Sequence, residues 1–66
     1  MNKAYKNKVD QKKFVRYKEG AKMYSMSQPK FEKVAKDAGA VYKLNKMVLV
    51  NVEIFETYLE TFRVVE

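Results

Sequence analysis

The fold is decided by the stretch SQPKFEKVAKDAG, residues 27–39. Ser27 can cap a helix, because its hydroxyl accepts a hydrogen bond from an otherwise free amide of the first turn. Pro29 falls within that turn, where a missing N–H costs nothing, and Gly39 suits a left-handed C-terminal cap. The apolar residues between them recur at i, i+3, i+4 and i+7, the spacing of one helical face. They are Phe31, Val34, Ala35 and Ala38. The pattern predicts a helix over residues 28–38.

A shorter helix is expected just before this one. Its apolar residues follow the spacing i, i+4 and i+7 and are Tyr17, Ala21 and Tyr24. This predicts a helix over residues 18–24, and Gly20 inside it is expected to lower its stability. Ser25 breaks the pattern, so a tight turn separates the two helices.

Residues 40–51, AVYKLNKMVLVN, predict a β-hairpin. Valine and tyrosine are strong strand formers, and Asn45–Lys46 is the expected two-residue turn, because Asn tolerates a positive φ. Asn51 is expected to cap a third helix, with Glu53 near the positive end of the helix dipole. The apolar face of this helix again has the spacing i, i+3, i+4 and i+7 and consists of Phe55, Tyr58, Leu59 and Phe62.

This order of elements predicts a small α+β winged helix-turn-helix domain. A short helix joined to a second helix by three or four residues is the helix-turn-helix unit. A two-stranded hairpin directly after it forms the wing, and the C-terminal helix closes the core. In such a unit the second helix lies in the major groove of double-stranded DNA. The domain is expected to span residues 14–66, starting with Phe14–Val15 as an extended lead-in, after a flexible basic arm of residues 1–13.

Composition restricts the class of protein. A chain of 66 residues has room for one domain. Without Cys or His it has no disulfide and no zinc site of the usual kind, and we expect no cofactor. The longest apolar run, Met47–Val50, is far shorter than the about 20 residues of a membrane-spanning helix. No apolar stretch follows the basic N-terminus as it would in a secretory signal, so we expect a cytoplasmic protein.

Charge is distributed unevenly along the chain. The formal net charge is +6, but residues 1–51 hold 13 Lys or Arg against four Asp or Glu, whereas residues 52–66 hold one Arg against four Glu. A basic body with an acidic C-terminal stretch indicates a surface presented to phosphate. The simpler alternative is that the lysines only aid solubility.

The candidate DNA-contacting residues lie at three places. Gln28 and Lys30, near the start of the second helix, can reach base edges, since Gln pairs well with adenine and Lys with guanine. Lys33 and Lys36 are expected to contact phosphates, which position a protein without reading sequence. The tip of the hairpin presents Lys43, Asn45 and Lys46. The basic arm adds Lys3, Lys6, Lys8, Lys12 and Lys13.

These motifs together resemble the excisionases, or recombination directionality factors, of bacterial phages and conjugative transposons, which share a fold with the mercury-resistance-type regulators. The resemblance covers about residues 15–59. The matching positions are Glu19-Gly20-Ala21, Ser25-Met26-Ser27, Phe31 with Val34, Gly39, Lys43-Leu44-Asn45-Lys46, and Phe55 with Leu59. The resemblance implies that Ser27, Gln28 and Lys30 start the recognition helix. It also implies that Lys33 lies along the groove, and that Asn45 and Lys46 form the tip of the wing.

The resemblance also implies a function. Excisionases bind repeated sites at the end of a mobile element, bend the DNA and favour excision by the integrase, and they have no catalytic activity of their own. Three features depart from the family pattern, the first being Gly20 inside the first helix, where it lowers helix stability. The second helix has no Arg, and the strand Met47–Val50 is apolar where relatives usually carry basic residues. This strand suggests an edge for cooperative self-association on DNA.

Two other functions stay open. A small transcriptional regulator of the same fold begins with the same groove contact. Such regulators usually append a dimerising helix or a ligand domain, and none follows residue 66, which favours the accessory factor. A protein-binding adaptor could use Met47–Val50 to pair with a partner strand.

An enzyme is not expected. The chain has no His, no Cys and no Gly-rich phosphate loop. Three carboxylates of the third helix could share a face, but they lack an evident partner. They are Glu53, Glu56 and Glu60.

Overall fold

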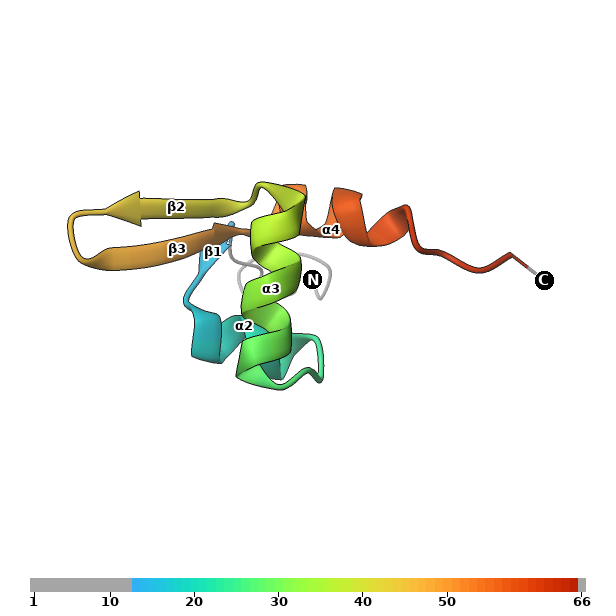
Figure 1. The fold of residues 1–66 in the computed structure, drawn as a ribbon, viewed down its shortest axis with the longest axis horizontal. Coiled ribbons are helices and arrows are strands. Elements are labelled where there is room, and N and C mark those ends of the chain that lie inside the picture. The colour runs from blue at the N-terminus through green and yellow to red at the C-terminus, as the bar shows by residue number, and fades with distance from the viewer. Residues whose placement is uncertain (1–12, 66) are drawn as a thin grey trace, which may run out of the picture.

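The computed structural model describes residues 13–65, which form a sheet and three helices. In chain order the elements are β1 (Phe14–Val15), α2 (Tyr17–Met23), α3 (Gln28–Ala38), β2 (Val41–Leu44), β3 (Met47–Asn51) and α4 (Val52–Glu60). The β2–β3 hairpin extends from one side of the helices, and the segment after α4 leaves on the other side (Figure 1). This is the predicted winged helix-turn-helix fold, with α2 and α3 as the helix-turn-helix unit and the hairpin as the wing. None of the described helices is long and apolar enough to cross a membrane.

The second predicted helix is confirmed at both of its ends. The Ser27 hydroxyl accepts a hydrogen bond from the Lys30 amide at 3.3 Å, and Gly39 adopts the left-handed conformation with φ 71. The first helix begins and ends one residue earlier than predicted. Its cap residue Tyr24 still donates its amide to the Gly20 carbonyl at 3.1 Å, so the helical hydrogen bonding reaches the expected end.

The two helices of the helix-turn-helix unit end in the same way. After each helix, a single residue takes the left-handed conformation: Ser25 after α2, with φ 56, and Gly39 after α3, with φ 71. The next amides, Met26 N–H and Ala40 N–H, then donate to carbonyls five residues back, at 2.9 and 3.0 Å. This is the Schellman motif, which satisfies carbonyls that the helix leaves free. Each of the two motifs turns the chain, so the first sets the direction of α3 and the second sets the direction of the hairpin.

The sheet has three antiparallel strands in the order β1-β3-β2. The predicted hairpin is confirmed, with Leu44 opposite Met47 and Asn45–Lys46 as the turn. Asn45 takes φ 58, whereas Lys46 does not have a positive φ. A type I′ turn requires positive φ at both central residues, so this turn is of another type and has no need of Gly in place of Lys46.

Phe14–Val15, predicted as an extended lead-in, is a third strand, β1. Val15 pairs with Val50, and Phe14 pairs with Asn51. This makes β3 the central strand of the sheet. The expected role of Met47–Val50 in self-association required an edge strand, and β3 is an edge over only part of its length. Val50 is fully buried, and only residues 47–49 of β3 lack a partner strand on their second side among the described residues.

The core lies where α2, α3, α4 and the sheet meet. Its largest side chains are the rings of Phe31 and Phe55, both fully buried with centroids 4.8 Å apart. Tyr24, the residue that follows α2, packs against both rings, with centroid distances of 6.1 and 4.7 Å. The remaining buried apolar residues are Val15, Ala21, Ala35, Ala40, Val50 and Val52.

The predicted face of the third helix is confirmed only in part. Asn51 caps α4, since its Oδ1 accepts the Ile54 amide at 3.0 Å. The helix ends at Glu60, however, so Phe62 lies beyond it and is 60% exposed. The amides of Phe62 and Arg63 donate to carbonyls only three residues back, which is the tighter hydrogen bonding of a final turn.

Candidate nucleic-acid interface

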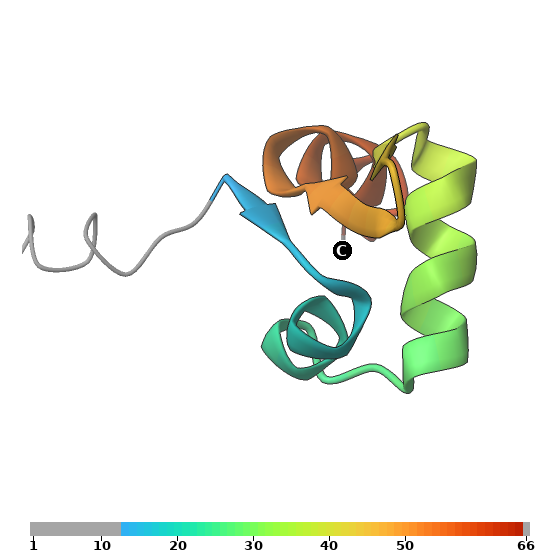
Figure 2. The same cartoon turned by 90° about the vertical axis from the view of Figure 1, so that its left-hand side faces the viewer.

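Helix α3 stands on one side of the molecule and leaves its outer face uncovered by any other described element (Figure 2). Its inner face is fixed by Phe31 and Ala35, which are both fully buried. The predicted site residues of this helix, Gln28, Lys30, Lys33 and Lys36, are all exposed. The core thus holds the helix in place with these four side chains at its surface, where Lys30 and Lys33 also line a pocket with Tyr58, Leu59 and Phe62.

The first turn of α3 carries two hydrogen bonds that involve predicted site residues. The Ser27 hydroxyl is engaged as the helix cap, so this residue positions the helix start. Gln28 Nε2 donates to Glu32 Oε2 at 3.2 Å. Both partners are at the surface, so the Gln28 amide can exchange this bond for one to a base edge at little cost.

The three lysines of α3 differ in their surroundings. Lys33 Nζ lies 3.3 Å from Asp37 Oδ2, whereas Lys30 and Lys36 form no side-chain ion pair or hydrogen bond within residues 13–65. An exposed ion pair contributes little, so Lys33 can reach a phosphate after leaving Asp37. Lys36 needs no such exchange.

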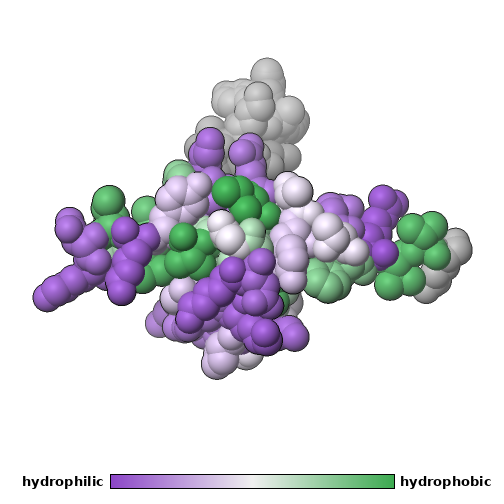
Figure 3. Space-filling view, turned by 45° about the horizontal axis from the view of Figure 1, so that its top comes forward, coloured by the Kyte–Doolittle hydropathy of each residue, from purple (hydrophilic) through white to green (hydrophobic). Residues whose placement is uncertain are grey.

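The hairpin carries the second predicted group of site residues. Lys43, Asn45 and Lys46 are all exposed at its far end, and hydrophilic side chains gather at that end in Figure 3. Strand β2, which carries Lys43, contacts α3 and follows it in the chain. The hairpin then extends away from the helices, so the cations of α3 and those of the hairpin tip lie on two consecutive elements (Figure 1).

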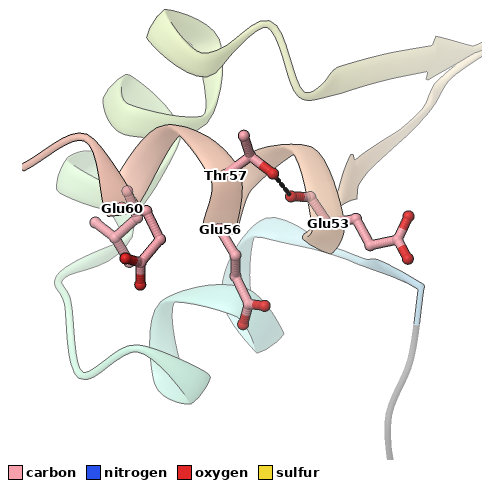
Figure 4. A pocket seen from close by; sticks show the side chains of 5 residues that line it. Glu53, Glu56, Thr57 and Glu60 are labelled. Atoms are coloured by element: carbon pink, nitrogen blue, oxygen red, sulfur yellow. Dashed lines mark hydrogen bonds between the residues drawn. The ribbon is translucent and has the colours of Figure 1, made fainter.

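The acidic residues of α4 occupy a different flank. Glu53, Glu56 and Glu60 line one shallow surface pocket with Thr57 (Figure 4), whereas Tyr58 lines the groove between α4 and α3. The Tyr24 hydroxyl donates to Glu56 at 2.5 Å, so this carboxylate has the partner that the sequence analysis did not find. Burial and this hydrogen bond raise the pKa of Tyr24 above its usual range.

Four of the five predicted arm lysines lie outside the described residues, namely Lys3, Lys6, Lys8 and Lys12. Lys13 is described, and its carbonyl accepts the Val52 amide at 2.8 Å. Its backbone is therefore hydrogen-bonded to the first residue of α4.

Three exposed cations on α2 and its cap are not among the predicted site residues. These are Arg16, Lys18 and Lys22. The spacing of Lys18 and Lys22 by four residues was the signal that could have placed them together on one flank of this helix.

Comparison with known proteins gives a family for the chain. A family model described as a family of unknown function (DUF6462) matches residues 12–62, and the chain belongs to this family. The matched range takes in every helix and strand of the structure. Searches of curated proteins and of solved structures found no match.

Proposed function

We propose that this DUF6462 family member is a sequence-specific double-stranded DNA-binding protein of the excisionase type. In this proposal it acts in the cytoplasm, without chemistry of its own. It binds and bends the ends of a mobile element and directs excision by an integrase. The observation that carries the DNA-binding part is the exposed face of α3, with its three lysines, beside a hairpin whose tip is also basic. The resemblance of the motifs to excisionases supports the assignment to recombination.

The mechanism follows from the position of each group. An α-helix fits the major groove of B-form DNA, and the N-terminal residues of a recognition helix contact base edges. Gln28 and Lys30 lie in the first turn of α3 and would contact bases, whereas Lys33 and Lys36 lie further along and would contact phosphates. The hairpin would lie over the neighbouring groove. The carboxylates of α4 favour this orientation, since phosphate repels the flank that carries them.

The test begins with selection of preferred duplexes from a randomised pool, followed by fluorescence anisotropy across a salt series. Each neutralised phosphate contributes about −0.9 to the slope of log K against log salt. We expect Lys36→Ala to make the slope shallower by about one unit, and Lys33→Ala by less, because Lys33 must first leave Asp37. Gln28→Ala should keep the slope and lose the preference for the selected site. Glu53→Gln, on the acidic flank, is the matched control and should leave site preference intact.

Two outcomes would favour the other functions. A flat salt slope together with weak, unselective binding would support a protein-binding adaptor, which the exposed apolar residues of the hairpin, Tyr42 and Leu44, favour. Tight, selective binding without bending and without stimulation of integrase-mediated excision would support a transcriptional regulator. Bending of the selected site, with increased excision in a reconstituted reaction, is the result expected of an excisionase.

A further inference from the structure

The β2–β3 hairpin has an apolar face that does not belong to the core. Residues directly opposite each other in an antiparallel pair project from the same face, and successive residues alternate. Val41 pairs with Val50, which is fully buried, so these two face the core. The opposite face is therefore formed by the pairs Tyr42 with Leu49 and Leu44 with Met47. Near the body of the protein the Phe14 ring contacts Tyr42, with centroids 5.3 Å apart.

The tip of this face is an exposed leucine. Leu44 is 59% exposed and lies beside the Asn45–Lys46 turn, opposite Met47. No described residue covers it, and such an exposed side chain adds little to the stability of the fold. Tyr42, two residues nearer the core, is already less exposed at 44%. The apolar side chain that projects furthest from the core is thus placed at the end of the hairpin.

The charges around this leucine match a polyanion. Lys43 precedes it and projects from the opposite face of β2, Lys46 lies in the adjacent turn, and residues 38–52 contain no Asp or Glu. An apolar tip between cations is complementary to DNA, whose phosphates are anionic and whose base pairs present apolar faces when they separate. Proteins that kink DNA from the minor groove insert leucine, methionine or similar side chains between base pairs in this way.

We propose that Leu44, supported by Met47, is a wedge that inserts between two base pairs from the minor groove and kinks the duplex. This inference rests on the proposed DNA binding. It adds to that proposal a cause for the DNA bend and a preference for certain base-pair steps in the binding site. Because β2 starts just after the C-terminal end of α3 and the hairpin extends away from the helices (Figure 1), its tip would engage the groove beside the one that α3 occupies. Pyrimidine–purine steps unstack most easily, so the wedge selects a TA or CA step at a fixed distance from the bases contacted by Gln28.

The test places 2-aminopurine, whose fluorescence rises when it unstacks, at successive positions of the selected duplex. The wild-type protein should raise the fluorescence at one step only and increase energy transfer between dyes at the two duplex ends. Leu44→Ala should lose both signals while it retains the salt slope. A duplex with a mismatch at that step should bind the wild type about tenfold or more tightly, since part of the unstacking has already occurred, and should give Leu44→Ala no such gain.

Two variants control the experiment. Leu44→Met keeps an apolar wedge and should keep the fluorescence signal, whereas Lys46→Ala should make the salt slope shallower but keep the signal of each bound complex. Because Leu44 and Lys46 are both exposed, these two variants and Leu44→Ala should retain the wild-type melting temperature.

The outcomes separate the two proposals. Absence of DNA binding by the wild type overturns both. Selective binding without a localised fluorescence change, or with the same change for Leu44→Ala, overturns the wedge alone. The wedge is also overturned if sedimentation shows that the free protein is a dimer and Leu44→Ala makes it a monomer. In that case the apolar face is a contact between two copies.

Discussion

Gly20 shows how one residue couples the two helices of the helix-turn-helix unit. A Cβ added at this position would lie 2.2 Å from Phe31 Cζ and 2.5 Å from Phe31 Cε2, so glycine is needed for the ring of α3 to pack directly on the backbone of α2. Helix propensity alone predicts that Gly20→Ala stabilises the protein by up to about 1 kcal/mol. We expect the reverse, a loss of about 1–3 kcal/mol in the free energy of unfolding, because the core becomes overpacked. Urea denaturation measures the change.

A double variant identifies the cause of that loss. Phe31→Leu removes the ring atoms that the new Cβ would meet, so Gly20→Ala should cost much less in the Phe31→Leu background. If Gly20→Ala costs the same stability in both backgrounds, a clash with the Phe31 ring is not the cause of the loss.

Tyr24 predicts a dependence of stability on pH. Burial and the hydrogen bond to Glu56 raise its pKa in the folded protein above the ordinary value of 10.0. Above about pH 10 the unfolded chain therefore loses this proton while the folded protein retains it, so the stability contribution present below pH 10 is lost as the pH rises. Tyr24→Phe removes the ionisation and should cost about 0.5–1.5 kcal/mol at neutral pH. Urea titrations from neutral to alkaline pH should show the wild-type advantage shrinking above pH 10.

The comparison with Tyr24→Phe removes the contribution of every other titrating group, because the two proteins share the remaining tyrosines and lysines. A difference in stability that stays constant across this pH range would show that the Tyr24 hydroxyl ionises as readily in the folded state as in the unfolded chain.

At the scale of the elements, the Schellman motifs after α2 and α3 differ in the residue that takes positive φ. Ser25 adopts φ 56 with a side chain, which costs roughly 1 kcal/mol relative to glycine. We expect Ser25→Gly to be neutral or to stabilise the protein by up to about 1 kcal/mol, and Gly39→Ala to destabilise it by a similar amount. A Cβ at Gly39 would have no atom within 4 Å, so any loss there comes from the backbone alone. Thermal unfolding of both variants checks this, and a loss of stability in Ser25→Gly would contradict it.

Local elements could be predicted from the sequence, because their signals lie within a few residues. The cap at Ser27, the apolar spacing and Gly39 together predicted α3, and the Asn45–Lys46 turn predicted the register of the hairpin. The pairing of β1 could not be predicted, because two residues show no period and their partner strand lies beyond two helices and another strand. The period of α4 continued to Phe62, but the helix ends at Glu60. The Thr61 hydroxyl there donates to the Tyr58 carbonyl at 2.6 Å.

The candidate site was predictable to the same extent. The polar face of α3 follows from its apolar spacing, so the exposure of its lysines was foreseen. The pairing of Lys33 with Asp37 follows from their i, i+4 spacing. The apolar face that ends at Leu44 depends on which face of the hairpin meets the core, and only the pairing with the rest of the sheet decides this. The direct packing of Phe31 on Gly20 is likewise a tertiary contact, without a local signal.

At the scale of the whole molecule, the distribution of charge predicts a preferred orientation on DNA. The hairpin and the segment after α4 leave opposite sides of the domain (Figure 1). The double variant Lys43→Ala/Lys46→Ala should therefore reduce the slope of log K against log salt by up to about 1.8, that is about 0.9 for each lost phosphate contact. Arg63→Ala, in the segment after α4, removes a cation from the other side and should leave the slope unchanged. An equal loss of slope per charge in both variants would mean that net charge alone attracts DNA, without a fixed orientation. In that case neither α3 nor the hairpin could contact a defined site. An oriented complex requires that only the hairpin variant lose slope. The reason is that the slope depends only on the phosphates that the bound protein neutralises.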